Sequence, residues 1–365
     1  MSTVAKDTVE DALSGIVDPH TGLDLVTGKS VNDCVVDNQN VSIDLVLGYP
    51  AKGWHPNLKQ EVVDVVSKLE NVQSVDVRIK TQVVSHEVQK GVTPLKNVRN
   101  VIAVASGKGG VGKSTVSANL ALALSGEGAN VGVLDTDIYG PSLPRMFGVS
   151  GRAVETEDKK AIEPKTSFGI QTMSIGFAVP EDDTAIIWRG PMVNHALNTL
   201  LMDTRWDNLD YLIIDLPPGT GDVQITLGQR LPVTCAVIVT TPQDIALLDA
   251  RKALNAFEKF EVPVLGIIEN MSTHICSNCG HEEHIFGKGG GQRMAEEYSV
   301  GYLGSIPLDG KIRENSDNGT PTVVADPDGD IALIYRDIAR KISGLLVKRK
   351  RDYSEVFPSI VIQND

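Results

Sequence analysis

The 365-residue sequence has few cysteines, few aromatic side chains and no long apolar run. Four cysteines are too few for the disulfide framework that stabilises small secreted domains. No stretch of about 18 apolar residues is present, so the sequence predicts no transmembrane helix. The first residues are polar and acidic and lack the apolar core of a signal peptide. We therefore expect a cytoplasmic protein without stable membrane association.

Positive charge is also scarce. The sequence has 34 lysines and arginines against 47 aspartates and glutamates, which gives a formal net charge of −13. A broad nucleic-acid surface needs clustered positive charge, so we expect no nucleic-acid partner. The hydrophobic fraction of 41% is ordinary for a globular protein, and the length suits one large and one small domain.

The hydrophobic pattern changes after the first quarter of the chain, and this change predicts a domain boundary. Residues 1–85 are expected to form a small α+β domain, because two helical patterns accompany two alternating stretches. The polar segment 86–97 contains glycine and proline and is interpreted as a linker. Residues 98–347 then form the second domain, and residues 348–365 are a C-terminal tail with a short basic run.

The same patterns predict the individual elements. In the small domain, one helical pattern runs from Val9 to Val17, before Asp18-Pro19, and a second covers residues 58–69. The second domain alternates apolar strands with helix-length segments, which predicts an α/β fold with a mostly parallel sheet covered by helices on both faces. The expected strands are 41–47 and 75–79 in the small domain, and 101–105, 131–134, 170–175, 211–214, 236–240, 264–268 and 302–306 in the second.

The most specific motif is G-x-x-x-x-G-K-S, which follows the first strand of the second domain and precedes a helical stretch. Its glycines let backbone N–H groups surround phosphates, and the helix N-terminus adds a partial positive charge. The motif predicts a P-loop NTPase that binds ATP and Mg²⁺, with Lys113 on the β- and γ-phosphates and the Ser114 hydroxyl on the metal. The expected nucleotide-binding residues are Gly107, Lys108, Gly109, Gly110, Val111, Gly112, Lys113, Ser114 and Thr115.

Carboxylates follow two of the expected strands. Asp215 ends the strand 211–214 and can hold Mg²⁺ directly or through water. Asp135 and Asp137 follow the strand 131–134, and they share one face if that strand continues so far. An aspartate at a strand end can also serve only as a helix cap, but we favour a functional role for Asp137.

A second lysine inside the loop resembles a particular class of P-loop proteins. The sequence K-G-G-V-G-K-S-T from Lys108 onward is similar to the deviant loop of MinD, ParA, the nitrogenase iron protein and the arsenite-pump ATPase. The resemblance implies a homodimer in which Lys108 reaches the neighbour's nucleotide. It also implies that Asp137 orients the attacking water and that Asp135 binds the metal or its waters. The candidate catalytic residues are therefore Lys108, Lys113 and Asp137.

Cys276 and Cys279 form a C-x-x-C pair on one short segment, for which three interpretations compete. With His281 and His284 they could bind zinc as a Cys₂His₂ set. A thioredoxin-like redox pair is the second, although such pairs usually open a helix early in a βαβ unit. The third is half of a ligand set, because a [4Fe–4S] cluster needs four thiolates and a homodimer would supply them. We favour this bridging cluster.

Taken together, the motifs resemble the Mrp/ApbC iron–sulfur cluster carriers over nearly the whole chain. Besides the loop, the resemblance depends on segments 137–142, 188–192, 215–222 and 269–291. The first domain resembles the small SufT-like iron–sulfur assembly domain. Many versions of that domain carry a cysteine after the second strand, but residues 49–54 here read YPAKGW.

The resemblance implies an ATPase that binds a [4Fe–4S] cluster and delivers it to apo-proteins, with slow hydrolysis coupled to transfer. Its partners would be a second copy, client apo-proteins and a cluster donor. Asn270 matches the family position that contacts adenine, although capping of nearby backbone is an alternative, and Cys34 is interpreted as a core residue. The rival function is a MinD/ParA-like positioning ATPase with a zinc-binding C-x-x-C loop.

Overall fold

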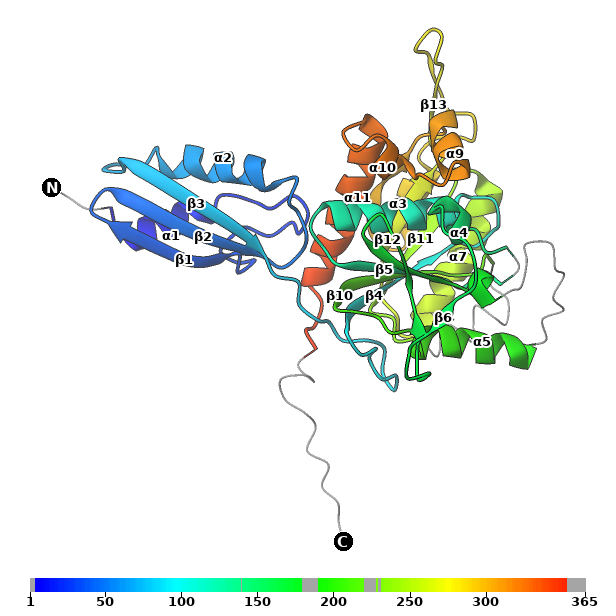
Figure 1. The fold of residues 1–365 in the computed structure, drawn as a ribbon. Helices are drawn as coiled ribbons and strands as arrows, with labels where there is room; N and C mark the ends of the chain where they lie inside the picture. Colours follow the sequence, from blue (N-terminus) through cyan, green and yellow to red (C-terminus); the bar gives the residue numbers. More distant parts are fainter. Residues whose placement is uncertain (1–3, 139, 179–189, 220–227, 229–230, 353–365) are drawn as a thin grey trace.

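The computed structural model describes residues 4–138, 140–178, 190–219, 228 and 231–352. Figure 1 shows a small sheet domain next to a larger one, with helix α11 between them. Three sequence features fall wholly or partly outside the described residues: Tyr139, Trp188 with Arg189, and Asp222. Among the described helices, none combines the length and the apolar character needed to cross a bilayer.

The small domain has three strands and two helices. Strands β1 (Val31–Asp37) and β2 (Asn40–Leu47) are antiparallel, and β3 (Ser74–Thr81) runs parallel to β2. Helices α1 (Lys6–Leu13) and α2 (His55–Val66) contact each other and the sheet, and they bury an apolar core that includes Cys34. The expected small α+β domain and the core position of Cys34 are confirmed.

Three details of the small domain differ from the expectation. Helix α1 ends at Leu13, and Val17 lies in an isolated bridge to Asp24, because the chain turns at Ser14 and Gly15. Helix α2 begins and ends three residues before the expected 58–69. Strand β1 was not expected, because only one of its seven side chains is buried and its pattern does not alternate.

The large domain is built on a sheet of eight strands in the order β15-β12-β11-β4-β10-β5-β9-β8. All neighbours are parallel except β8, an antiparallel edge strand that the sequence did not indicate. All seven expected strands are present. The eight strands of the sheet, including the unexpected β8, are β4 (Val98–Ala105), β5 (Val131–Asp135), β8 (Lys165–Ser167), β9 (Ile170–Ser174), β10 (Leu209–Asp215), β11 (Cys235–Thr240), β12 (Val264–Asn270) and β15 (Gly301–Ile306).

Helices cover both faces of this sheet, as expected, because its central strands are apolar on both sides. Two separate cores result, one under α3 and α11 and the other under α5, α7 and α8. The longer helices are α3 (Lys113–Gly126), α5 (Gly190–Met202), α7 (Asp244–Lys259), α8 (Gly290–Glu297), α9 (Gly310–Asp317) and α11 (Asp330–Val347). The short elements are α4 (Leu143–Met146), α10 (Thr322–Ala325), a 3₁₀ turn (Ile175–Ala178), β6 (Val154–Glu155), β7 (Ile162–Glu163), β13 (His274–Ile275) and β14 (Glu282–Glu283).

The small domain is attached to the large one at the end of α3. The carboxylate of Glu127, which is 1% exposed, accepts hydrogen bonds from the Gly53 N–H (2.8 Å) and from Arg340 of α11 (2.9 Å). A Cβ atom at Gly53 would lie 2.9 Å from Glu127 Oε1, so glycine permits this approach. The segment YPAKGW therefore contacts the large domain through Gly53.

Replacing Glu127 by alanine should lower the free energy of unfolding by about 3 kcal/mol, because it leaves Arg340 buried without its partner. Urea denaturation followed by circular dichroism measures the change. Lys252→Ala is the control, since it removes an exposed ion pair with Asp249 and should cost less than about 1 kcal/mol. Equal effects of the two substitutions would contradict a structural role for Glu127.

Candidate functional site

The phosphate loop joins β4 to α3 at the carboxyl edge of the sheet. Gly110 and Gly112 have φ angles of 82° and 80°, which glycine adopts without the strain of a side chain. A Cβ atom at Gly107 would lie 2.0 Å from the backbone of Asp249, so this position also requires glycine. Lys108 is exposed on the loop, and its carbonyl accepts a hydrogen bond from Ser106 Oγ (3.0 Å).

Lys113 and Asp215 form a buried ion pair at the start of α3. Lys113 Nζ lies 2.7 Å from Asp215 Oδ2, and the two side chains are 5% and 0% exposed. Ser114 Oγ donates to the same carboxylate oxygen at 2.6 Å. The structure thus brings the expected phosphate-binding lysine together with Ser114 and Asp215, two of the three expected Mg²⁺ ligands.

Ser117 is a further residue of this cluster that the sequence analysis missed. Its hydroxyl donates to Asp215 Oδ1 at 2.6 Å and is also 3.0 Å from the carbonyl oxygen of Lys113. Ser117 is fully buried. Ser117 stands one helical turn after Lys113 on the same face of α3, and this spacing is the signal that could have identified it.

Asp135 and Asp137 lie differently from each other. Asp135 is fully buried at the end of β5 and accepts hydrogen bonds from the N–H groups of Asp137 (3.0 Å) and Leu143 (3.1 Å). Burial, together with the nearby Asp215 carboxylate, raises the pKa of Asp135 to about 7. Because β5 ends at Asp135, the two carboxylates do not share one face of a continuing strand. Asp137 is half-buried on the segment that follows.

Asn270 ends β12 and contacts the phosphate loop. Its side-chain amide donates a hydrogen bond to the carbonyl oxygen of Val111 at 2.8 Å, and the residue is 6% exposed. In this structure Asn270 therefore caps loop backbone, the alternative to a contact with adenine.

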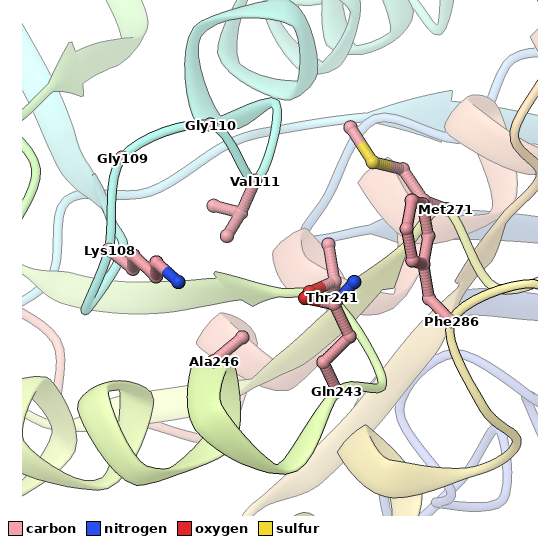
Figure 2. A pocket seen from close by; sticks show the side chains of 9 residues that line it. All are labelled: Lys108, Gly109, Gly110, Val111, Thr241, Gln243, Ala246, Met271 and Phe286. Atoms are coloured by element: carbon pink, nitrogen blue, oxygen red, sulfur yellow. The ribbon is translucent and has the colours of Figure 1, made fainter.

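An open cavity of about 220 Å³ lies beside the loop (Figure 2), and its lining residues are Lys108, Gly109, Gly110, Val111, Thr241, Gln243, Ala246, Met271 and Phe286.

Cys276 and Cys279 lie on the turn of a hairpin formed by β13 and β14, which projects from the large domain in Figure 1. Gly280, with φ of 70°, closes the turn by donating its N–H to the Cys276 carbonyl at 2.8 Å. Cys276 is half-buried and Cys279 exposed. The backbone N–H groups of Cys279 and Asn278 stabilise the Cys276 thiolate and lower the pKa of that thiol.

The histidines of this segment do not join the cysteines. His281 is exposed, and the Nδ1 atom of His284 is hydrogen-bonded to the carbonyl of Ser272 at 3.2 Å. Within the described part of the chain, no three or more His, Cys, Asp or Glu side chains are placed to hold one metal ion. The described residues of one chain therefore present two cysteine thiols on the hairpin.

The doubly covered parallel sheet, the loop at its carboxyl edge and the lysine–serine–aspartate cluster define this chain as a P-loop NTPase. Comparison with known proteins agrees. A model described as the NUBPL iron-transfer P-loop NTPase matches residues 97–343, and a model for an iron–sulfur cluster assembly protein matches residues 6–77. The chain belongs to the NUBPL iron-transfer P-loop NTPase family.

Curated proteins that are similar in sequence agree with this family assignment. An iron–sulfur cluster carrier protein from Salmonella typhimurium is 46% identical over 338 residues, which cover 93% of this chain and 91% of the relative. An iron–sulfur cluster carrier protein from Pseudomonas fragi is 54% identical over 275 residues, covering 75% of this chain and 96% of the relative. The iron–sulfur cluster transfer protein NUBPL of Dictyostelium discoideum is 48% identical, covering 68% of this chain and 77% of the relative.

Solved structures resemble the large domain. A nucleotide-binding protein from Archaeoglobus fulgidus, in complex with ADP, has 37% identity and a TM-score of 0.56, covering 64% of this chain and 90% of that protein. The cell division ATPase MinD of Pyrococcus furiosus has 23% identity and a TM-score of 0.50, covering 67% of this chain and 99% of that protein. The second likeness supports the fold.

Substituting Ser117 by alanine should lower Mg²⁺-dependent ATP hydrolysis about tenfold, because Asp215 loses the donor that orients it. The Mg²⁺ concentration for half-maximal rate should rise as well, which a titration at fixed ATP measures. Ser125→Ala, near the far end of the same helix, should leave both quantities unchanged. An unaltered Mg²⁺ titration for Ser117→Ala would rule out the orienting role.

Proposed function

We propose that this protein is an ATP-hydrolysing carrier that binds a [4Fe–4S] cluster between two copies of the chain and transfers it to apo-proteins. The observation that carries the proposal is the projecting hairpin, which presents Cys276 and Cys279 on a P-loop NTPase of an iron-transfer family. The curated relatives named iron–sulfur cluster carriers support the same activity. The cluster is cargo that is received from a donor and released to a client.

The side chains grouped around Asp215 indicate how the nucleotide would bind. Lys113 would leave this carboxylate for the β- and γ-phosphates, whose negative charge offers it a second partner. Ser114, Asp215 and Asp135 provide the oxygen atoms that Mg²⁺ prefers, and the ion would neutralise phosphate charge. Asp137, which is half-buried beside them, would orient the attacking water. We propose slow turnover coupled to cluster transfer.

The homodimer explains how a single C-x-x-C pair could hold a cluster. A [4Fe–4S] cluster takes four cysteine thiolates, and the described residues of one chain present two on the hairpin. The buried Cys34 and Cys235 cannot reach it, since they are 4% and 0% exposed. Lys108, exposed on the loop, would complete the neighbour's nucleotide site. Exposed thiolates suit the reducing cytoplasm, where we expect the carrier to act.

A positioning ATPase of the MinD/ParA type is less well supported. A membrane-binding version would need a free amphipathic helix, but α11 buries Tyr335, Ile338 and Ile342 against the large domain. A DNA-binding version would need clustered positive charge, which the net charge of −13 does not favour. Neither version uses the cysteine hairpin.

Lys113→Ala should reduce ATP hydrolysis at least about a hundredfold, because the phosphates lose their charged partner. The same variant should still accept a cluster, since the hairpin lies outside the phosphate loop. Phosphate release and the absorption of reconstituted protein measure the two properties. Unchanged turnover would remove Lys113 from the active site.

Cys276→Ala should abolish cluster binding while nucleotide binding stays within about twofold of the unmodified protein, because the thiolate is a ligand and not part of the loop. Iron and sulfide analysis after anaerobic reconstitution measures the loss. Cys34→Ala removes a buried thiol of the small domain and serves as the matched control that should keep its cluster. A normal cluster spectrum in Cys276→Ala would refute the bridging site.

A further inference from the structure

The cysteine hairpin begins and ends at the cavity beside the phosphate loop. Met271 precedes strand β13 and Phe286 follows strand β14, and both side chains line the cavity opposite Lys108 and Val111 (Figure 2). Any ligand or loop movement that fills this cavity therefore meets the two ends of the hairpin directly.

The segment that leads into strand β13 is hydrogen-bonded to the phosphate loop. Asn270 donates to the Val111 carbonyl at 2.8 Å, and a Cβ atom at Gly112 would lie only 2.3 Å from the Asn270 amide nitrogen. The next residue, Met271, has a φ of 56°, a left-handed conformation that is uncommon for a side chain of its size. This turn directs the chain out of the sheet and into the hairpin.

Backbone contacts brace the hairpin just above its base. The Ser272 N–H donates to the Ile306 carbonyl at 3.0 Å, and the Ser272 carbonyl is bonded to His284 across the hairpin. After strand β14, the chain enters α8. A Cβ atom at Gly290 would lie 2.6 Å from the Pro242 carbonyl oxygen, so the start of α8 is packed tightly against the segment that contains Gln243. Phe286 lies between these two fixed points.

We propose that Phe286 is a positioning residue that couples the phosphate loop to Cys276 and Cys279. Nucleotide bound in the loop presses the loop against Met271 and the Phe286 ring, and the hairpin base becomes braced in one geometry. The thiols are then held in a single arrangement and become less accessible. The inference rests on the proposed function and supplies the route between its nucleotide and cluster sites.

Thiol alkylation of the full-length, reduced, cluster-free protein tests this route. Iodoacetamide is the probe, and peptide mass spectrometry follows Cys276 and Cys279 separately, with no nucleotide, with Mg²⁺-ADP or with Mg²⁺-ATPγS at saturation. Nucleotide should slow Cys276 alkylation about fivefold or more, a typical coupling between two sites. The buried Cys34 and Cys235 should stay unmodified and report that the protein is folded.

Phe286→Ala should bind nucleotide but lose the nucleotide effect on alkylation, and Met271→Ala should behave alike. Phe286→Leu, which keeps an apolar group in the cavity, should restore most of it. Ile285→Ala is the matched control, because Ile285 is 50% exposed and does not line the cavity. Binding of a fluorescent ADP analogue confirms saturation in every variant.

The coupling is refuted if nucleotide leaves the alkylation of the unmodified protein unchanged, or if Phe286→Ala and Met271→Ala keep the full effect. If both variants keep the full effect, the slower alkylation with nucleotide would be attributed to association of two chains. Reconstitution of the same preparations separates this outcome from failure of the proposed function. A protein that takes up a cluster without the alkylation effect retains the carrier function and loses only the route through Phe286.

Discussion

The contact between Lys113 and Asp215 determines how the nucleotide site is built. Two charges buried together are stable only when the geometry is good and the remaining oxygen and nitrogen positions are bonded. Here the carboxylate accepts from Lys113, Ser114 and Ser117, so β10 is tied to the first turn of α3. The contact fixes the end of the phosphate loop where α3 begins, and it keeps the lysine beside the place where phosphates would bind.

The parallel sheet brings the other functional groups to the same edge. Asp215 and Asp135 occupy paired positions on neighbouring strands, so their carboxylates are held close together. Burial and the neighbouring Asp215 charge raise the pKa of Asp135. Strand β12, farther along the sheet, supplies Asn270 and then continues into the cysteine hairpin. The end of β12 thus contacts the phosphate loop and leads into the proposed cluster site.

Sequence patterns predicted the features that depend on local chemistry. The glycine loop, the aspartate after strand β10 and the C-x-x-C pair each carry their own signal, and seven apolar strands were recognisable by composition. The bond from Asn270 to Val111, the orienting Ser117 and the contact of Gly53 with Glu127 depend on partners far apart in the chain. The partners in each pair are far apart in the sequence, so the bonds between them became visible only in the folded structure. The exposed strand β1 was missed for a related reason, since few of its side chains are buried.

The proposed carrier function depends on one cluster that two chains share through Cys276 and Cys279. Anaerobic reconstitution, followed by iron and sulfide analysis, absorption and EPR spectra and measurement of the native mass, tests it most directly. We expect a dimer that contains about four iron and four sulfide atoms per two chains, with the spectrum of a [4Fe–4S] cluster. A single chain with one tightly bound zinc ion and no sulfide would contradict it.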